Sequence, residues 1–263
     1  MPSYWREKVV LITGASAGFG LALATAFHQA GAKVVLVARD ASRLEQAAAN
    51  LSSQVATIAA DVTQDADVAR MIEATIRAHG RLDCLVNNAG RSSRGALLAT
   101  PLEEYRAQWE LNFLSLVRCT QAAAPHLLES RGHVINMGSL AAKSTSPFMG
   151  AYASSKFPVA AFSQQLRQEL AAAGVHVMLV CPGPIQRDDT APRYQAEGIP
   201  ESAKKPGGGV KLKGIPPADL SARVLHAAEH RKAELVVPAK ARLLFAISQL
   251  SPGLGDWIVR KMT

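Results

Sequence analysis

Short apolar runs alternate with longer amphipathic stretches along most of this 263-residue chain, and this alternation limits its fold more than any other feature. Seven runs rich in Val and Ile have the length of strands: Val9–Ile12, Val34–Val37, Val55–Ile58, Cys84–Val86, Val134–Met137, Val175–Cys181 and Leu235–Val237. The main stretches with a helical pattern are 18–30, 41–50, 65–79, 102–126, 151–173 and 217–230. Strands separated by helices form parallel βαβ units. We therefore expect an α/β fold, a doubly wound (Rossmann) parallel sheet of seven strands with helices on both faces.

The length predicts one domain, residues 1–263, because it is near the upper end of what one α/β core fills. One break in composition, about 193–217, is too rich in Gly and Lys to be a core element. We expect a mobile substrate loop there, beyond the carboxyl ends of the strands, where ligands bind in this architecture. The segment from about 238 to 263 is an apolar and basic tail.

The start of the chain lacks the charged, apolar and small-residue pattern of a signal peptide, and no run of about 18 apolar residues follows. We therefore expect a cytoplasmic protein. Three cysteines, Cys84, Cys119 and Cys181, lie far apart in apolar segments. We expect them to be reduced core residues rather than a disulfide framework or a CxxC metal site.

The net charge of +8 is uneven, because residues 193–263 contribute +6 of it. These basic residues are scattered and lack interleaved aromatic residues, so we expect no binding to nucleic acid. A phosphorylated cofactor, an acidic carrier protein or a membrane surface fits the charge better.

The segment Thr13–Gly20, Thr-Gly-Ala-Ser-Ala-Gly-Phe-Gly, directly follows the first strand and opens the first helix. In this context Gly14 permits a tight turn, Gly18 allows backbone N–H groups to approach a pyrophosphate, and Gly20 lets the helix lie close to the strand. The free N–H groups and the dipole of the helix N-terminus favour the anion. The segment predicts a dinucleotide site; the alternative is a tight strand-to-helix connection.

Six motifs follow one another in a characteristic order: TGxxxGxG at 13–20, Asn87-Asn-Ala-Gly90, Asn112, Ser139, Tyr152-Ala-Ser-Ser-Lys156 and Pro182-Gly183. As a set they resemble the short-chain dehydrogenase/reductase (SDR) family, and the resemblance covers residues 8 to about 186. It implies a nicotinamide-dependent oxidoreductase that interconverts a carbonyl and an alcohol.

The spacing of four between Tyr152 and Lys156 puts both side chains on one face of a helix. A free tyrosine has a pKa of about 10, too high for efficient proton exchange near neutrality. The ammonium group of Lys156 would lower that pKa by favouring the phenolate. The resemblance implies that Lys156 also binds the nicotinamide ribose.

Ser139 ends the fifth strand, where its hydroxyl can polarise a substrate carbonyl as negative charge develops on the oxygen. The resemblance implies that Asn112 holds a water that links Lys156 to solvent. The expected catalytic set is thus Asn112, Ser139, Tyr152 and Lys156. Each has a purely structural alternative, namely a surface tyrosine, a solvated lysine, a helix-capping serine and an asparagine that satisfies backbone groups. One shared mechanism replaces four separate explanations.

The resemblance also assigns the cofactor contacts. It implies that the backbone at 88–90 packs against the cofactor and that Pro182-Gly183-Pro-Ile185 closes over the nicotinamide. It also implies that Asp61-Val62 contacts the adenine. The alternative for Asp61 is that it caps the next helix. The expected set is Gly14, Ser16, Ala17, Gly18, Phe19, Gly20, Arg39, Asp61, Val62, Asn88, Ala89, Gly90, Tyr152, Lys156, Pro182, Gly183 and Ile185.

The end of the second strand favours NADP(H). Ala38 stands where an NAD-binding enzyme needs an acid for the ribose 2′-hydroxyl. Arg39 follows and can pair with a 2′-phosphate, and Arg43 can assist. Two residues point the other way: Ala17 occupies a place where many NADP-using relatives carry Arg or Lys, and Asp40 can reach a 2′-hydroxyl. An NAD-dependent alcohol dehydrogenase is therefore the alternative.

The tail resembles those of relatives that act on steroids or lipids. It combines Lys and Arg with bulky apolar residues and can contact a membrane surface. We favour the alternative that its apolar residues cover the substrate pocket or a subunit interface: Leu243, Leu244, Ile247, Leu250, Trp257 and Ile258. The expected reaction is reduction of an apolar ketone or aldehyde, such as a 3-oxoacyl chain, a steroid-like ketone or a retinal-like aldehyde.

The seven histidines show no paired metal-ligand spacing on a common element, so we expect no metal. Two rival functions share the fold: a nucleotide-binding regulator without turnover and a sugar-nucleotide epimerase or dehydratase, which usually needs a longer C-terminal domain. Relatives commonly pair the helices near 102–126 and 151–173, so by analogy we expect a homodimer or homotetramer.

Overall fold

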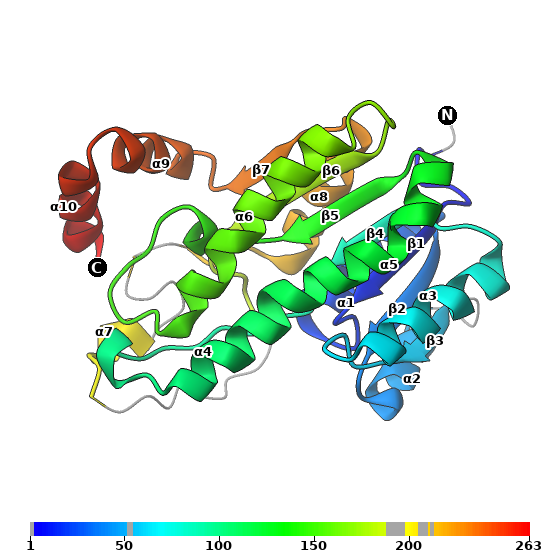
Figure 1. The fold of residues 1–263 in the computed structure, drawn as a ribbon, viewed down its shortest axis with the longest axis horizontal. Coiled ribbons are helices and arrows are strands. Elements are labelled where there is room, and N and C mark those ends of the chain that lie inside the picture. Colours follow the sequence, from blue (N-terminus) through cyan, green and yellow to red (C-terminus); the bar gives the residue numbers. More distant parts are fainter. Residues whose placement is uncertain (1–2, 52–54, 188–197, 205–209, 211–212) are drawn as a thin grey trace.

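The computed structural model of the protein describes residues 3–51, 55–187, 198–204, 210 and 213–263. Within these residues seven parallel strands form one sheet in the order β3-β2-β1-β4-β5-β6-β7 (Figure 1). The strands are β1 Val9–Thr13, β2 Lys33–Ala38, β3 Ala56–Ala59, β4 Cys84–Asn87, β5 His133–Met137, β6 His176–Pro182 and β7 Glu234–Val237. The expected seven-stranded parallel sheet is confirmed.

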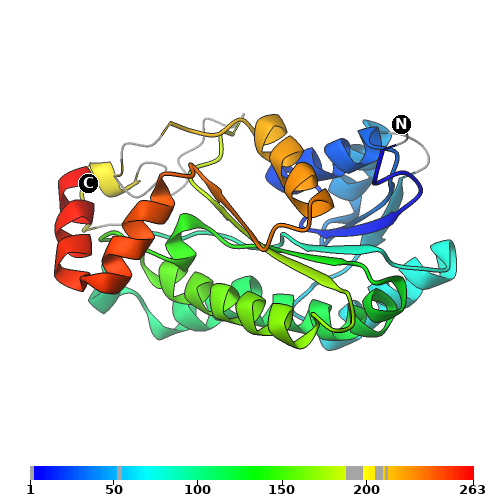
Figure 2. The ribbon, with the colours of Figure 1, turned by 90° about the horizontal axis from the view of Figure 1, so that it is seen from above.

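Helices cover both faces of the sheet (Figure 2). One layer consists of α1 Gly18–Gln29, α2 Ala41–Ala49 and α8 Pro217–Glu229. The other consists of α3 Asp65–His79, α5 Ser115–Ser130 and α6 Ala151–Glu169. Because both faces are covered, all five residues of β1 are buried, which explains why its first four residues are a continuous apolar run rather than an alternating one.

The segment of α3 matches the predicted range, and its ends show why. Asp65 and Asp67 lie in the first turn, where negative charge is favoured by the helix dipole. Gly80 follows the last turn with a φ of 73°, the left-handed conformation that commonly ends a helix.

The predicted helix 102–126 is wrong in two respects. It is divided into α4 Leu102–Trp109, a π-helical turn η2 Glu110–Leu114, and α5, which continues past Pro125 to Ser130. A π turn inserts an extra residue into the helix, and it often marks a functional position. Here it contains Asn112, whose side chain bonds to residues outside its own turn.

The segment about 193–217 is described only in part. It contains a short helix, α7 Glu201–Lys204, which the composition did not predict. About half of the expected mobile substrate loop, namely 193–197, 205–209 and 211–212, lies outside the described residues. Its mobility remains a prediction.

The C-terminal tail forms two helices, α9 Ala241–Leu250 and α10 Pro252–Met262, which pack against each other beyond the end of the sheet (Figures 1 and 2). A methyl group on Gly255 would lie 2.7 Å from the Cα of Ser248, so the close approach of the two helices requires glycine there. None of the described helices is both long enough and apolar enough to cross a membrane. All three cysteines are buried and free, as expected.

Candidate active site

A cleft of about 1140 Å³ opens at the carboxyl ends of the strands. In the sheet β1 lies between β2 and β4. The strands β2 and β3 are added on one side of β1 and the strands from β4 onward on the other, and α/β proteins bind ligands at the point where the strand order reverses in this way. The cleft brings together most of the predicted site residues: Gly14, Ala17, Gly18, Phe19, Gly20, Asn88, Gly90, Ser139, Tyr152, Lys156, Pro182, Gly183 and Ile185. Its lining does not include Ser16, Arg39, Asp61, Val62, Ala89 or Asn112.

Three glycines in the turn after β1 are required for different reasons. Gly14 has a φ of 66°, and a Cβ there would lie 2.9 Å from the Cα of Ala89. Gly18 also has a positive φ, 56°, but open space around it. A Cβ on Gly20 would overlap the carbonyl oxygen of Gly14. The turn is therefore closed tightly against β4 while its Gly18 side remains open to the cleft.

Thr13 and Asn88 join the glycine turn to the end of β4. The Oγ1 of Thr13 accepts hydrogen bonds from the N–H groups of Asn88 and Ala89, both at 3.0 Å. The Nδ2 of Asn88 donates to the carbonyl oxygens of Thr13 and Gly14, at 2.9 and 3.1 Å. Sequence reasoning gave Thr13 no role, although its position directly before the first glycine was a usable signal.

Lys156 extends from α6 into the base of the cleft and is buried. Its Nζ donates a hydrogen bond to the carbonyl oxygen of Met137, at the end of β5, at 2.8 Å. Burial lowers the pKa of Lys156 to about 8, because desolvation disfavours the ammonium form. Tyr152 lies one turn earlier on the same helix and also lines the cleft. The helix therefore presents a phenol and an amine with a perturbed pKa to the same space.

Ser139 follows β5 and lines the cleft. Its Oγ accepts a hydrogen bond from the N–H of Ala141 at 3.1 Å and so caps the short helix η3 Leu140–Ala142. The capping alternative is therefore realised, but it uses only the acceptor capacity of the hydroxyl. No acceptor for the hydroxyl hydrogen occurs among the described residues, so this hydrogen can donate to a ligand.

Asn112 is buried, lies outside the cleft lining and bonds to the backbone of Arg91, which is part of that lining. Its Oδ1 accepts from the N–H of Arg91 at 2.8 Å, and its Nδ2 lies 2.9 Å from the carbonyl oxygen of Arg91. The same Nδ2 lies within hydrogen-bond distance of Gln108 Oε1 and Ser155 Oγ. A Cβ on Gly90 would lie 2.7 Å from Asn112 Oδ1. The structure thus shows Asn112 satisfying backbone groups, as the structural alternative held, and its expected bond to a water remains a prediction.

The residues after β2 and β3 form a polar cluster outside the cleft. Arg39 is largely exposed and lies 3.8 Å from the carboxylate of Asp61. Asp40 accepts from the N–H of Arg43 at 3.0 Å and so caps α2.

Asp61 is engaged locally as well. Its Oδ1 accepts from both the N–H and the hydroxyl of Thr63, at 2.9 and 2.7 Å. It does not cap α3, whose N-cap residue is Gln64.

The end of the cleft away from the glycine turn is lined by apolar side chains from the C-terminal tail. Of the tail residues expected to cover a pocket, the structure places these in the cleft wall: Leu243, Leu244, Ile247 and Ile258. Leu250 and Trp257 are absent from the lining and are 87% and 52% exposed. The cleft therefore combines a glycine-rich end with an end lined by α9 and α10.

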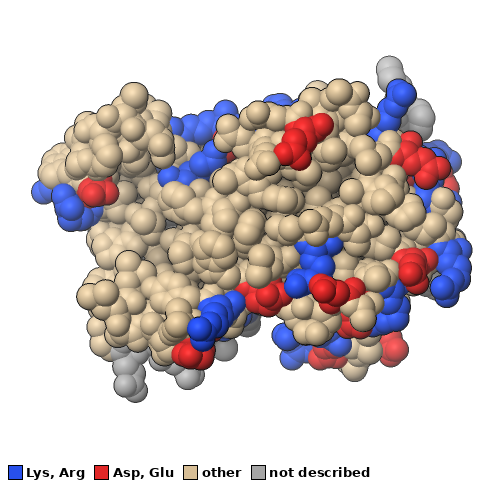
Figure 3. Space-filling model, viewed as in Figure 1, with Lys and Arg blue, Asp and Glu red and all other residues tan. Residues whose placement is uncertain are grey.

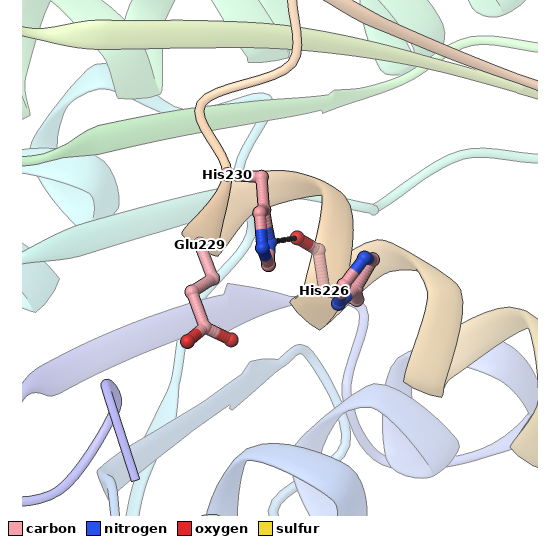
Figure 4. Close-up of side chains that lie close together, drawn as sticks. All are labelled: His226, Glu229 and His230. Atoms are coloured by element: carbon pink, nitrogen blue, oxygen red, sulfur yellow. Dashed lines mark hydrogen bonds between the residues drawn. The ribbon is translucent and has the colours of Figure 1, made fainter.

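The expectation that no histidines pair on one element is wrong at the end of α8. His226 and His230 are four residues apart, and their ligand atoms lie within 4.8 Å of each other and of a Glu229 carboxylate oxygen (Figure 4). The spacing of four was visible in the sequence, and it places side chains on one helix face.

Comparison with known proteins gives a consistent result. A family model described as short chain dehydrogenase matches residues 8–198. Dehydrogenase/reductase SDR family member 7B from Danio rerio is 30% identical over 242 residues, which are 88% of this chain and 77% of that protein. The uncharacterized oxidoreductase YxnA from Bacillus subtilis is 32% identical over 264 residues, 98% of this chain and 72% of that protein.

Two solved structures are also similar. A short-chain dehydrogenase from Streptomyces avermitilis has a TM-score of 0.83 and 27% identity and covers 98% of both chains. L-sorbose reductase from Gluconobacter frateurii, complexed with NADPH and L-sorbose, has a TM-score of 0.78 and 27% identity, over 90% of this chain and 97% of that one.

Proposed function

Since the chain belongs to the short-chain dehydrogenase family, we propose that it is an NADP(H)-dependent oxidoreductase that interconverts a carbonyl and an alcohol. The observation that carries the proposal is that Ser139, Tyr152 and the buried Lys156 line the same cleft as the glycine turn. A protein that only bound a nucleotide would not need a proton donor, a buried amine and a free hydroxyl hydrogen around one space.

The residues present fit a dinucleotide. The turn lacks Cβ atoms where a methyl group would close it, so its backbone N–H groups and the start of α1 can hold a pyrophosphate. Lys156 would hold the nicotinamide ribose, and Pro182, Gly183 and Ile185 would lie against the nicotinamide. When bound, the nicotinamide supplies the hydride for reduction or accepts it in oxidation.

In the proposed reduction, Tyr152 gives its phenolic proton to the carbonyl oxygen as negative charge develops there. Lys156, with a pKa of about 8, is mostly charged at neutral pH, and its charge stabilises the resulting phenolate. The hydroxyl hydrogen of Ser139 donates to the same oxygen and lowers the energy of the transition state. Oxidation of an alcohol uses the same groups in reverse.

The preference for NADP(H) rests on the residues after β2. Arg39 is exposed and offers a guanidinium group to a 2′-phosphate, for which it would exchange its long ion pair with Asp61. Asp40 already caps α2 and pairs with Arg43 at 3.4 Å, so binding a ribose 2′-hydroxyl would compete with these interactions. L-sorbose reductase, a structural neighbour, is complexed with NADPH, which agrees with this choice. The alternative is an NAD-dependent alcohol dehydrogenase in which Asp40 leaves its cap.

The substrate we propose is an apolar ketone or aldehyde. The side chains from α9 and α10 give one end of the cleft an aliphatic wall, and such a wall favours an apolar chain over a sugar. An NADP(H) preference also favours reduction.

We further propose that the protein is one catalytic domain that assembles as a homodimer or homotetramer through the helices near 102–126 and 151–173, which are α4, η2 and α5 on one side and α6 on the other. Figure 3 shows a broad area with few charged residues on the face that these helices share. Large apolar side chains are exposed on the segments concerned: Leu102, Trp109, Leu114 and Phe157. Burying such residues is the usual reason for association.

Cofactor titration tests the proposal. NADPH and NADH are titrated into the wild-type protein and into Arg39→Ala, with nicotinamide fluorescence as the signal, and carbonyl compounds are then screened with the preferred cofactor. We expect NADPH to bind at least about tenfold more tightly than NADH, and the difference to disappear in the variant.

Equal or tighter binding of NADH would instead support the NAD-dependent alternative and make Asp40 the candidate ribose ligand. Binding of neither cofactor would overturn the oxidoreductase proposal and favour a protein without turnover.

A further inference from the structure

The exposed C-terminal end of α8 gathers three potential metal ligands outside the cleft. His226, Glu229 and His230 occupy positions i, i+3 and i+4, so one rigid helix presents all three side chains on one side (Figure 4). The two imidazole rings have centroids 4.1 Å apart. None of the three residues belongs to the lining of the cleft.

The ring of His230 is already oriented as a metal ligand would be. Its Nδ1 lies 2.8 Å from the carbonyl oxygen of His226, and only a protonated nitrogen can donate to that oxygen (Figure 4). The Nε2 of His230 therefore carries the lone pair in this tautomer. Histidines that bind metals almost always donate their other N–H group to a carbonyl or carboxylate in this way.

The remaining ligands are available without rearrangement of the backbone. No hydrogen-bond partner for the His226 ring or the Glu229 carboxylate occurs among the described residues. Ligands of a tetrahedral zinc site lie about 3.4 Å apart, given Zn–N distances of 2.0–2.1 Å. The present spread of up to 4.8 Å closes to this value by side-chain rotation, which exposure permits.

Some charges around the cluster favour the binding of a cation and others oppose it. The C-terminal end of a helix carries a partial negative charge, which adds to that of Glu229 and favours a cation. The positive charges of Arg223, one helical turn earlier, and of Lys232, two residues after His230, oppose it. Arg231 is directed elsewhere, because its guanidinium donates to the carbonyl oxygen of Gly174.

We propose that His226, Glu229 and His230 form a surface site for a divalent first-row transition-metal ion of the Zn²⁺ type, with water completing the coordination. Two imidazoles and one carboxylate suit Zn²⁺ better than Ca²⁺ or Mg²⁺, which take mainly oxygen ligands. The end of α8 leads into the amino end of β7. The site therefore lies near the amino ends of the strands, whereas the cleft lies at their carboxyl ends. The ion therefore stabilises the end of α8 and takes no part in carbonyl chemistry.

The test is competition for Zn²⁺ between the full chain, prepared without a histidine tag, and a chromophoric zinc chelator. We expect one Zn²⁺ per chain. His226→Ala and His230→Ala should each weaken binding at least tenfold, and Glu229→Gln should weaken it measurably. The matched control is His126→Ala, a histidine on α5 outside the cluster, which should bind as the wild type does.

A second measurement separates this site from stray binding. Co²⁺ bound to the wild type should give a visible absorption spectrum that both histidine variants lose and the control keeps. No saturable binding of Zn²⁺, or equal binding by His226→Ala, would overturn the proposal. Circular dichroism confirms that the variants are folded, and an unchanged NADPH titration shows that the result is independent of the proposed oxidoreductase function.

Discussion

His133 of β5 and His176 of β6 lie directly opposite each other in the sheet, with their Nδ1 atoms 3.0 Å apart. The hydroxyl of Tyr4 lies 2.7 Å from His133 Nε2, and His176 Nε2 lies 2.9 Å from the carbonyl oxygen of Lys232. Since that carbonyl only accepts, His176 carries its proton on Nε2 and accepts from His133 at Nδ1. His133 then accepts from the Tyr4 hydroxyl, and both rings are neutral.

This series of hydrogen bonds between neutral histidines predicts that the folded protein loses stability in acid. Burial and the neighbouring His176 lower the pKa of His133 to about 3, and burial lowers the pKa of His176 as well. The ordinary pKa is about 6.5, so the unfolded state takes up protons first as the pH falls. The stability that the neutral pair contributes is fully present above pH 6.5 and is lost between about 6.5 and 3.

Urea unfolding at pH 7.5 and 4.5 measures this loss. We expect the unfolding free energy of the wild type to fall by about 2–3 kcal/mol more than that of His133→Leu/His176→Leu. His28→Gln, on α1, serves as the control and should keep the wild-type difference. Equal losses in the wild type and the double variant would show that other groups cause the acid sensitivity.

Tyr152→Phe removes the proposed proton donor and keeps the ring. General acid catalysis contributes about 10² to 10⁴ in rate, so kcat/KM should fall by that factor. NADPH affinity should fall far less, because the phenyl ring and the other expected cofactor contacts remain. Tyr105→Phe is the matched control, since the hydroxyl of Tyr105 donates to Leu97 on an exposed segment. Turnover by Tyr152→Phe at the wild-type rate would remove Tyr152 from the mechanism.

Gly20→Ala tests the closeness of the first helix to the glycine turn. The added methyl group would overlap the carbonyl oxygen of Gly14, in the turn, and lie 2.6 Å from Nδ2 of Asn88, which joins the turn to the end of β4. We expect NADPH to bind at least about tenfold more weakly, and unfolding to become easier by about 1–3 kcal/mol. Gly253→Ala, with nothing within 4 Å, should change neither quantity. Fluorescence titration and urea unfolding of both variants decide the matter.

Ile247→Ser places a hydroxyl in the apolar wall of the cleft. Because we propose that this wall binds the substrate by burying its aliphatic surface, KM for a long-chain ketone should rise by about tenfold, with little change for a short one. Leu250→Ser lies on the same helix but outside the lining and should behave as the wild type. The measurement is steady-state kinetics with ketones of increasing chain length. A change in KM that is the same for all of them would contradict the prediction.

Most of the sheet was predictable because its central strands are buried on both faces and therefore form mainly apolar runs, as β1 and β6 do. The glycine turn was predictable because its position between a strand and a helix limits what it can do. The π turn was not, since it depends on bonds between Asn112 and residues distant in sequence such as Arg91 and Ser155. The short helix η3, which Ser139 caps, was not predictable either, because three residues are too few to leave a periodic pattern, although the capping role itself was one of the alternatives for Ser139.

The tail shows a different limit. Its apolar residues recur at helical spacing in 241–250, yet only the packing decides that Ile247 faces the cleft and Leu250 faces outward. The pairing of His226 with His230 was, by contrast, visible in the sequence, because it needs only the helix that we had already predicted.

The position of α9 and α10 in the chain has an evolutionary consequence. They follow all seven strands and lie beyond residues 8–198, which the family model matches. Substitutions in these helices can therefore reshape the wall that we propose meets the substrate while the glycine turn, Tyr152 and Lys156 remain as they are. Relatives that inherit the same sheet can acquire new specificities by exchanging this segment, and a chimera that carries another relative's last two helices should keep its cofactor and change its substrate.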